Sequence, residues 1–200
     1  MGDLKKDLEN EEYVLWLRFK SGDSNAFSQI YSRYVGILYN YGYHILPDTF
    51  LVQDAIQDLF ADLWRTRQNL SDTSSIKYYL FRSLRRKIHR LTEDEQLFDS
   101  FPEADQIASI PCTPSDETLQ IESETMDEQI HTLQRALLSL PPRQAEAIRL
   151  RFYDGFELHE VANIMQMNEQ SVRNLIQRSI RKLRLSFNLL MILYLIYNFF

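Results

Sequence analysis

Polar side chains between residues 170 and 181 have the types and spacing that suit contact with base pairs. On a helix, Gln170, Asn174, Gln177, Arg178 and Arg181 share one side and Arg173 lies at its flank. Amide and guanidinium groups pair with base edges in the major groove, whereas the later Lys182 and Arg184 suit phosphates. The pattern predicts a helix that reads duplex DNA.

The residues around this helix have the pattern of a helix-turn-helix over residues 157–184. Such a motif needs apolar residues where its two helices pack and a small residue where they approach most closely. Ala162 is the small residue, and Gln166–Asn168 is the expected turn, without the usual glycine. The packing positions are Val161, Met165, Met167, Val172 and Leu175. A generic helical hairpin is the alternative interpretation.

A second cluster combines cations with aromatic rings. Its acid-free basic run comprises Lys77, Arg82, Arg85, Arg86, Lys87 and Arg90, and the rings of Tyr78, Tyr79 and Phe81 are interleaved with it. Bases stack on aromatic rings while cations follow phosphates, so this composition suits single-stranded or melted nucleic acid. An ordinary basic helix with core aromatics accounts for the same residues equally well.

The charge of the chain is distributed unevenly. The net charge is −6, but residues 92–128 contain twelve acidic residues and no Lys or Arg, so the rest of the chain is net positive. That acidic stretch also contains three prolines and has no sustained apolar period, which is typical of a linker. We therefore expect helical domains over 10–92 and 125–186, an acidic linker over 93–124 and an apolar tail over 187–200.

The elements that must position these side chains are predicted to be helices. Apolar residues recur at helical spacing, the chain has only five glycines, and no strand alternation competes, so the fold class is all-α with two small domains. Helices are expected over 11–20, 24–45, 51–67 and 76–91. In the third, Ile56, Leu59, Phe60 and Leu63 form an apolar face, while Asp54, Asp58 and Asp62 form an acidic stripe. The stripe is either solvated or meets a basic partner.

Several classes of function lack their signatures. The chain has no glycine-rich phosphate loop ending in GK[ST] and no GxSxG, so we expect no enzyme. Four His and one Cys without CxxC or HExxH predict no metal site, and no cofactor is expected. The single Cys112 and the charged N-terminus without an apolar signal segment indicate a reducing, cytoplasmic compartment.

The two motifs together resemble a known family. The stretch LPPRQAEAIRLRFYDGFELHEVANIMQMNEQSVRNLIQRSIRKLR resembles region four of bacterial RNA polymerase sigma factors, and DAIQDLFADLW resembles region two. No region three separates them. The order and the length of 200 residues are similar to the extracytoplasmic-function group, of the ferric-citrate regulator type. The resemblance implies a transcription initiation factor that binds core RNA polymerase and directs it to promoters.

The resemblance also implies roles for single residues. The surface pressed against the clamp coiled coil of the polymerase β′ subunit would comprise Asp54, Gln57, Asp58, Phe60, Leu63 and Trp64. The loop 66–75 and the helix 76–90 would grip the melted −10 element, through Lys77, Tyr78, Arg82, Arg85, Arg86 and Arg90. Arg86 stands where the family commonly has Asn. The −35 reader would comprise Gln170, Ser171, Arg173, Asn174, Gln177, Arg178 and Arg181.

Two questions stay open at this point. A conventional dimeric repressor or activator with a sensing N-terminal domain is the alternative function, although it gives no reason for DAIQDLFADLW. The tail SFNLLMILYLIYNFF is too short for a membrane-spanning helix, so we expect it to pack on the chain's own domains, on an inhibitory anti-sigma partner or in a membrane interface. The acidic linker and this tail are also expected to hold the two domains in a compact, inactive arrangement.

Overall fold

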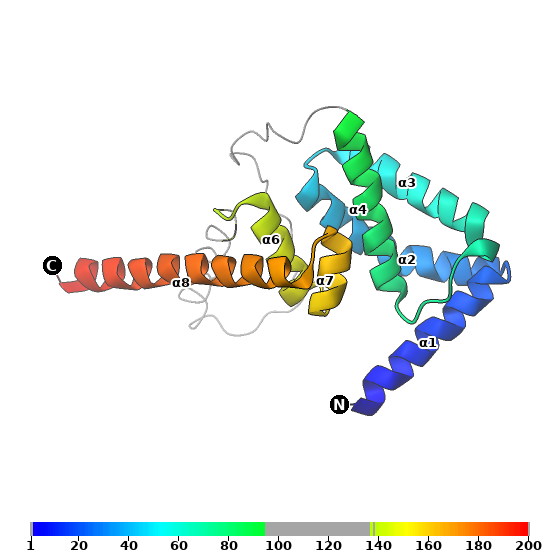
Figure 1. The fold of residues 1–200 in the computed structure, drawn as a ribbon, viewed down its shortest axis with the longest axis horizontal. Helices are drawn as coiled ribbons and strands as arrows, with labels where there is room; N and C mark the ends of the chain where they lie inside the picture. Colours follow the sequence, from blue (N-terminus) through cyan, green and yellow to red (C-terminus); the bar gives the residue numbers. More distant parts are fainter. Residues whose placement is uncertain (1, 95–136, 138, 200) are drawn as a thin grey trace, which may run out of the picture. The chain divides into compact units, whose positions relative to one another are not determined.

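The computed structural model describes the backbone of residues 2–94, 137 and 139–199 and the side chains of residues 11–92, 137 and 139–184. The expected linker from residue 95 onward and the side chains of the expected tail lie outside the described residues. Within the described ranges all regular structure is helical (Figure 1), which confirms the all-α fold class.

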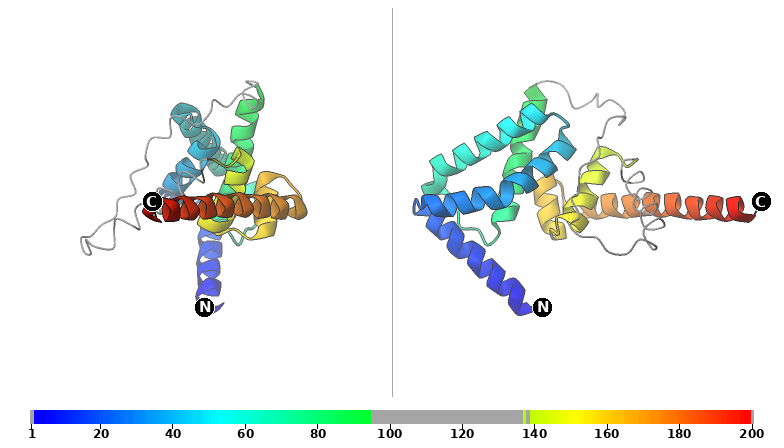
Figure 2. Two further views of the ribbon diagram at one scale, coloured as in Figure 1. Left: turned by 90° about the vertical axis from the view of Figure 1, so that its left-hand side faces the viewer. Right: turned by 180° about the vertical axis from the view of Figure 1, so that it is seen from behind.

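The helices follow the expected order along the chain. The N-terminal half contains α1 (Gly2–Lys20), α2 (Ser24–Ile45), α3 (Thr49–Thr66), the 3-10 turn η1 (Arg67–Asn69) and α4 (Ile76–Asp94). The C-terminal half contains α6 (Pro142–Ile148), the π-helical turn η3 (Arg149–Tyr153), α7 (Leu158–Met165) and α8 (Glu169–Phe199). The main departures are at the ends, since α1 begins before the expected residue 11 and α8 runs without interruption into the tail (Figure 2).

Contacts divide the chain into two compact units. The first contains α1 to α4 and η1 together with α7, and the second contains α6, η3 and α8. The expected boundaries at 10–92 and 125–186 differ from this grouping, because α7 packs on α4 within the first unit. The domain limits therefore stay a prediction.

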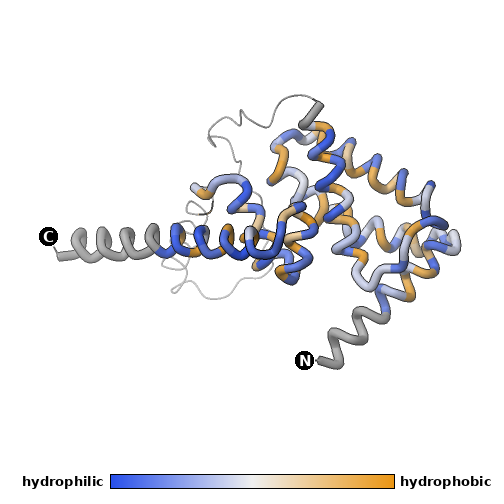
Figure 3. The backbone as a smooth tube through the Cα atoms, in the orientation of Figure 1, coloured by the Kyte–Doolittle hydropathy of each residue, from blue (hydrophilic) through white to orange (hydrophobic). Residues whose placement is uncertain are grey.

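The core of the first unit forms where α2, α3 and α4 pack on one another and α1 packs on α2 and α4. Along these helices apolar residues recur at each turn between polar ones (Figure 3). The largest side chains that are fully buried here include Trp16, Phe19, Tyr41, Leu63 and Phe81. Each such aliphatic or aromatic side chain contributes about 1.5–3 kcal/mol through burial, so this core is the main source of the unit's stability.

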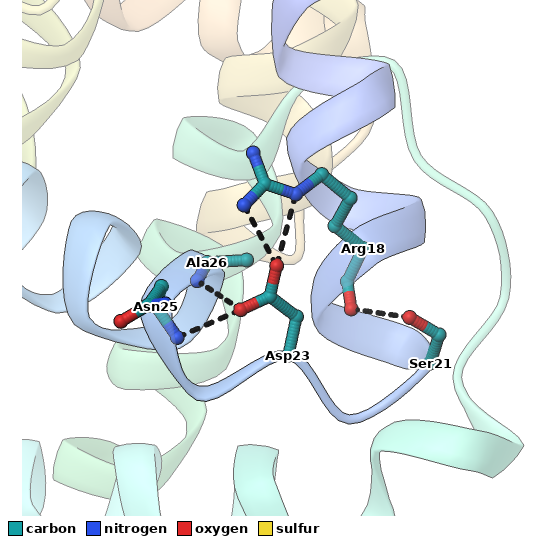
Figure 4. A network of polar contacts seen from close by, with 5 residues as sticks. All are labelled: Arg18, Ser21, Asp23, Asn25 and Ala26. Carbon is teal, nitrogen blue, oxygen red and sulfur yellow. Dashed lines mark hydrogen bonds and ion pairs between the residues drawn. The ribbon is translucent and has the colours of Figure 1, made fainter.

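Asp23 fixes the start of α2 (Figure 4). One carboxylate oxygen accepts hydrogen bonds from the backbone N–H groups of Asn25 at 2.8 Å and Ala26 at 3.2 Å. The other accepts from two guanidinium nitrogens of Arg18 at 2.9 and 2.7 Å. The hydrogen bond from Arg18, followed by that from Ala26, holds the pKa of Asp23 below its usual range. The cap therefore ties the end of α1 to the beginning of α2.

The segment that leads into α7 is seated on α4. The ring of Phe156 is only 4% exposed and lies edge-on to Phe81, with the ring centroids 4.9 Å apart. The ring of Tyr78 is 6.5 Å from it, and the ammonium of Lys77 lies 5.1 Å from its centroid. These contacts are the physical reason why α7 groups with the N-terminal helices.

The second unit has a small apolar core. Leu140, Ala147 and Leu150 are buried in and near α6 and η3. The Nε of Arg149 lies 3.7 Å from a carboxylate oxygen of Asp154, whose side chain is almost fully buried. The ammonium of Lys182 on α8 donates to the backbone oxygen of Ser139 at 2.6 Å, so α8 is connected to the segment before α6.

Candidate nucleic-acid interface

The turn before α8 has a left-handed residue in place of a glycine. Helix α7 ends at Gln166, which has φ 55° and ψ 45°. The backbone N–H of Met167 donates to the oxygen of Ala162 at 2.8 Å, which closes the turn by a hydrogen bond typical of helix C-termini. The turn at Gln166–Asn168 thus forms where it was expected, and backbone hydrogen bonding stabilises it although glycine is missing.

Helix α8 presents most of the expected −35 residues to solvent. Val172 and Ile176 are buried, as is Ser179, whose hydroxyl donates to the oxygen of Leu175 at 2.8 Å. Asn174 is half-buried and its side-chain oxygen accepts a hydrogen bond from Gln170 at 3.2 Å. Ser171 is also half-buried, and the exposed residues of the set are Gln170, Arg173, Gln177, Arg178 and Arg181. One helix therefore carries amide and guanidinium groups on a continuous exposed face.

Helix α4 divides its cations between two environments. Lys77 and Tyr78, near its start, face Phe156, and so lie at a protein contact. Farther along, Arg82, Arg86 and Arg90 recur at every fourth residue and so share one face of the helix. Arg86 and Arg90 are exposed, while Arg82 and Arg85 are half-buried. The expected −10 residues thus form a stripe of arginines beyond a covered first turn.

Hydrogen bonds also hold the loop before α4. The Ser75 side chain accepts a hydrogen bond from the backbone N–H of Tyr78 at 3.2 Å, in the manner of an N-cap. The hydroxyl of Thr73 accepts from the backbone N–H of Ser75 at 3.2 Å. Ser71, Asp72 and Ser74 are exposed. The loop is therefore an ordered segment with polar side chains toward solvent.

The acidic face of α3 contains only part of the surface expected to meet the polymerase. Asp54, Gln57 and Asp58 are exposed. Phe60 and Leu63 are 3% and 2% exposed, because their side chains form the core between α3 and its neighbours. In the isolated chain these two side chains are therefore covered by neighbouring helices, and their contact with the polymerase stays a prediction.

Trp64 lies at the edge of that core. Its half-buried indole packs against Phe27, with ring centroids 5.1 Å apart, and the Arg67 guanidinium lies 4.3 Å from its ring centroid. A guanidinium over an indole face is a favourable cation–π arrangement. Of the three expected apolar contacts, Trp64 alone is partly accessible.

Asp62, the third acid of the stripe, bridges two helices. Its carboxylate accepts from Lys87 of α4 at 2.6 Å and from Arg65 of α3 at 2.6 Å. The hydrogen bond from Lys87 is the main cause that lowers the pKa of Asp62. Helical spacing placed Asp62 with Asp54 and Asp58, but the partner on α4 is a tertiary contact that spacing within one helix does not reveal.

The described part of the chain contains neither a metal-binding cluster nor a membrane-spanning helix. Among those residues, no three His, Cys, Asp or Glu side chains gather in a way that would hold a metal ion. Over the same residues, we find no helix that combines the length and the apolar character needed to cross a lipid bilayer.

Comparison with known proteins gives matches in both halves of the chain. Residues 30–97 match the family described as sigma-70 region 2, and residues 130–183 match sigma-70, region 4. The chain is 24% identical over 164 residues to the ECF RNA polymerase sigma factor SigK of Mycolicibacterium vanbaalenii, covering 81% of this chain and 82% of that protein. It is 25% identical over 178 residues to the ECF RNA polymerase sigma factor BldN of Streptomyces coelicolor, covering 83% of this chain and 62% of that protein.

Two solved structures share the fold. CnrH, solved in complex with the cytosolic domain of CnrY, aligns with a TM-score of 0.58 at 19% identity, over 88% of this chain and 96% of that one. The sigma factor RpoE from Bartonella quintana, solved with the anti-sigma factor NepR, aligns with a TM-score of 0.55 at 20% identity, over 81% and 96%. At this identity the likeness concerns the fold.

Proposed function

The chain belongs to the sigma-70 family, in its extracytoplasmic-function group, and is a transcription initiation factor; from this premise we propose which surface performs each step of promoter recognition. The observation that carries the proposal is the presence in one chain of an exposed acidic face on α3 and an exposed amide and guanidinium face on α8. A conventional dimeric regulator needs only the second of these.

We assign the −35 element to α8. Its exposed face comprises Gln170, Arg173, Gln177, Arg178 and Arg181, with Ser171 and Asn174 beside them. Arginine pairs with guanine and the amides pair with adenine in the major groove, so these side chains suit direct readout. Arg184, also exposed, lies beyond them on α8 and suits a phosphate.

Substitutions on α8 should fall into two classes. Arg173→Ala or Gln177→Ala should weaken binding by about 1–3 kcal/mol and relax the preference at one or two base pairs, because a base contact is lost. Arg184→Ala should weaken all sequences similarly, because a phosphate contact carries no sequence information. Selection by the holoenzyme from a randomised −35 library measures both effects. Identical profiles for Arg173→Ala and Arg184→Ala would show that the groove assignment is wrong.

We assign binding of the melted −10 element to the loop 66–75 and to the arginine stripe of α4. Arg82, Arg86 and Arg90 on one face suit the phosphates of a strand that runs along the helix, and Arg85 lies beside them. Lys77 and Tyr78 complete this surface with the part of each side chain that stays exposed beside Phe156.

We propose that one surface of α3 binds the β′ clamp coiled coil of core RNA polymerase. It comprises Asp54, Gln57, Asp58 and the accessible part of Trp64. Exposed carboxylates at one-turn spacing suit a basic partner helix. Phe60 and Leu63 support this face from the core behind it.

We further propose that an anti-sigma protein is a regulatory partner of this chain, because the similar sigma factor RpoE was solved in complex with one. We propose the bacterial cytoplasm as the compartment, because polymerase and promoters lie there.

Run-off transcription from genomic fragments tests the function as a whole. With core RNA polymerase and the protein together, we expect transcripts that begin at a small set of sites, and neither component alone should give them. The alternative of a dimeric repressor or activator makes the opposite prediction for binding, since such a protein protects duplex DNA without polymerase. A specific footprint from the protein alone, with no transcripts on adding core enzyme, would replace our proposal by that alternative.

A further inference from the structure

One face of α1 contacts the loop that we assign to the melted strand. Glu12, Trp16 and Lys20 follow one another at every fourth residue, so their side chains leave α1 on the same side. All three contact residues 71–76, which come more than fifty residues later in the chain. This part of α1 precedes residue 30, where the match to sigma-70 region 2 begins.

Glu12 acts at the end of the loop, where α4 begins. One oxygen of its carboxylate accepts a hydrogen bond from the backbone N–H of Ile76 at 3.0 Å. That N–H belongs to the first residue of α4 and has no partner within the helix, and a carboxylate there also interacts favourably with the helix dipole. Glu12 is therefore a cap for α4 that a different helix supplies.

Tyr34 of α2 fixes the other oxygen of the same carboxylate. Its hydroxyl donates a hydrogen bond to Glu12. Burial, together with this hydrogen bond, raises the pKa of Tyr34, so the hydroxyl keeps its proton and remains a donor. Glu12 thus has a partner on α2 as well as on α4, and its side chain is held in one orientation.

Trp16 and Lys20 act at the beginning of the loop. The indole N–H of the fully buried Trp16 donates to the backbone oxygen of Ser71 at 3.1 Å. The ammonium of Lys20, whose side chain is 22% exposed, pairs with the carboxylate of Asp72. The loop is thus attached to α1 near both of its ends, while Ser74 between them is exposed.

We infer that Glu12, Trp16 and Lys20 form a positioning platform that holds residues 71–76 ready for the melted −10 strand. The inference rests on the proposed function, in which this loop and α4 bind that strand. None of the three residues contacts DNA in this scheme. They act by ordering the loop before binding, because a loop that is already ordered loses less conformational entropy when its ligand binds.

Two neighbouring glutamates allow a matched experiment. Glu12→Ala removes the cap, whereas Glu11→Ala makes the same chemical change at the adjacent exposed position of α1. Glu12→Gln keeps an oxygen that accepts from the N–H of Ile76. The probe is a fluorescent single-stranded oligonucleotide with the non-template −10 sequence of a promoter mapped by run-off transcription. Holoenzyme is titrated with this strand and with a −35 duplex. In a separate assay, the free protein is titrated with core enzyme.

The expected result is selective. Glu12→Ala should weaken binding of the single strand by about 5- to 10-fold, which lies within the range expected for the loss of one intramolecular hydrogen bond. Glu11→Ala and Glu12→Gln should bind the strand within about twofold of the parent chain, and binding of the −35 duplex and of core enzyme should not change. Lys20→Met, which keeps the apolar stem, should give a smaller loss and serves as the second variant if Glu12→Ala does not fold.

A spectroscopic measurement separates positioning from a general loss of stability. A spin label at Ser74→Cys, in a chain with Cys112→Ser, should become more mobile with Glu12→Ala and not with Glu11→Ala. Two results would overturn the platform. The first is that Glu12→Ala weakens binding of the single strand, the −35 duplex and core enzyme equally, and the second is that its affinity for the single strand is unchanged. If the parent holoenzyme itself fails to bind the strand, the −10 assignment fails instead.

Discussion

Replacing Asp54 and Asp58 together with lysine is expected to weaken binding to core RNA polymerase by about 3 kcal/mol or more, close to a hundredfold or more in Kd. Both carboxylates are exposed on α3, one helical turn apart, so the double substitution converts attraction to a basic surface into repulsion. Fluorescence anisotropy with labelled protein and core enzyme measures the change.

The matched control for this result is the pair Asp54→Asn and Asp58→Asn. These substitutions keep size and shape and remove only charge, so the loss should be smaller than that of the lysine pair. Circular dichroism should show the same helix content for all variants, because neither residue contributes to the core. An unaltered affinity of the lysine variant for core enzyme would eliminate the acidic face of α3 as the polymerase contact.

Adding one methyl group at Gly42 is expected to lower the free energy of unfolding by about 1–3 kcal/mol. A Cβ atom there would lie 2.8 Å from Cγ1 of Val52 and 3.3 Å from Cδ1 of Ile88. Gly42 is thus a point of close approach between α2 and both α3 and α4. Gly42→Val adds still more volume at this crossing and should prevent stable folding. Urea denaturation of Gly42→Ala measures the effect.

At Gly36, on the same helix, the same substitution is expected to change the free energy of unfolding in the opposite direction. A Cβ atom at Gly36 would meet nothing within 4 Å, so Gly36→Ala should raise the free energy of unfolding by about 0.5–1 kcal/mol through helix propensity alone. The two substitutions are chemically identical and should differ in sign. If Gly42→Ala and Gly36→Ala both stabilise the protein, the three helices do not approach one another closely at Gly42.

Helical periodicity predicted α1 to α4 and the pair α7 and α8, but it identified neither α6 nor η3 and did not assign every role. The apolar spacing of Ile56, Leu59, Phe60 and Leu63 predicts a buried face, and the structure buries all four. The family resemblance instead implied a partner for Phe60 and Leu63. At these two positions the structure confirms the core expected from the spacing, and the contact with a partner stays a prediction.

The contacts that the sequence did not predict join residues far apart in the chain. In each case the packed helices bring the two partners together. The pairs are Glu12 with Ile76, Asp62 with Lys87, and Phe156 with Phe81. Local spacing places a residue on a face of its own helix and contains no information about which face of another helix lies opposite. The turn at Gln166 was predicted in place, but its left-handed conformation without glycine depends on backbone hydrogen bonding.

Under these assignments, the carboxylate of Asp62 would also connect two binding equilibria. It is shared between α3, which we assign to polymerase, and Lys87 of α4, which we assign to DNA. A basic group of core enzyme that attracted Asp62 would compete with Lys87 and would leave the Lys87 ammonium available to a phosphate. By thermodynamic reciprocity, DNA that attracted Lys87 would then strengthen polymerase binding by the same factor. The Asp62–Lys87 ion pair would then couple the two binding events. Polymerase and promoter would act as heterotropic ligands, each increasing the affinity of the chain for the other without direct contact between them.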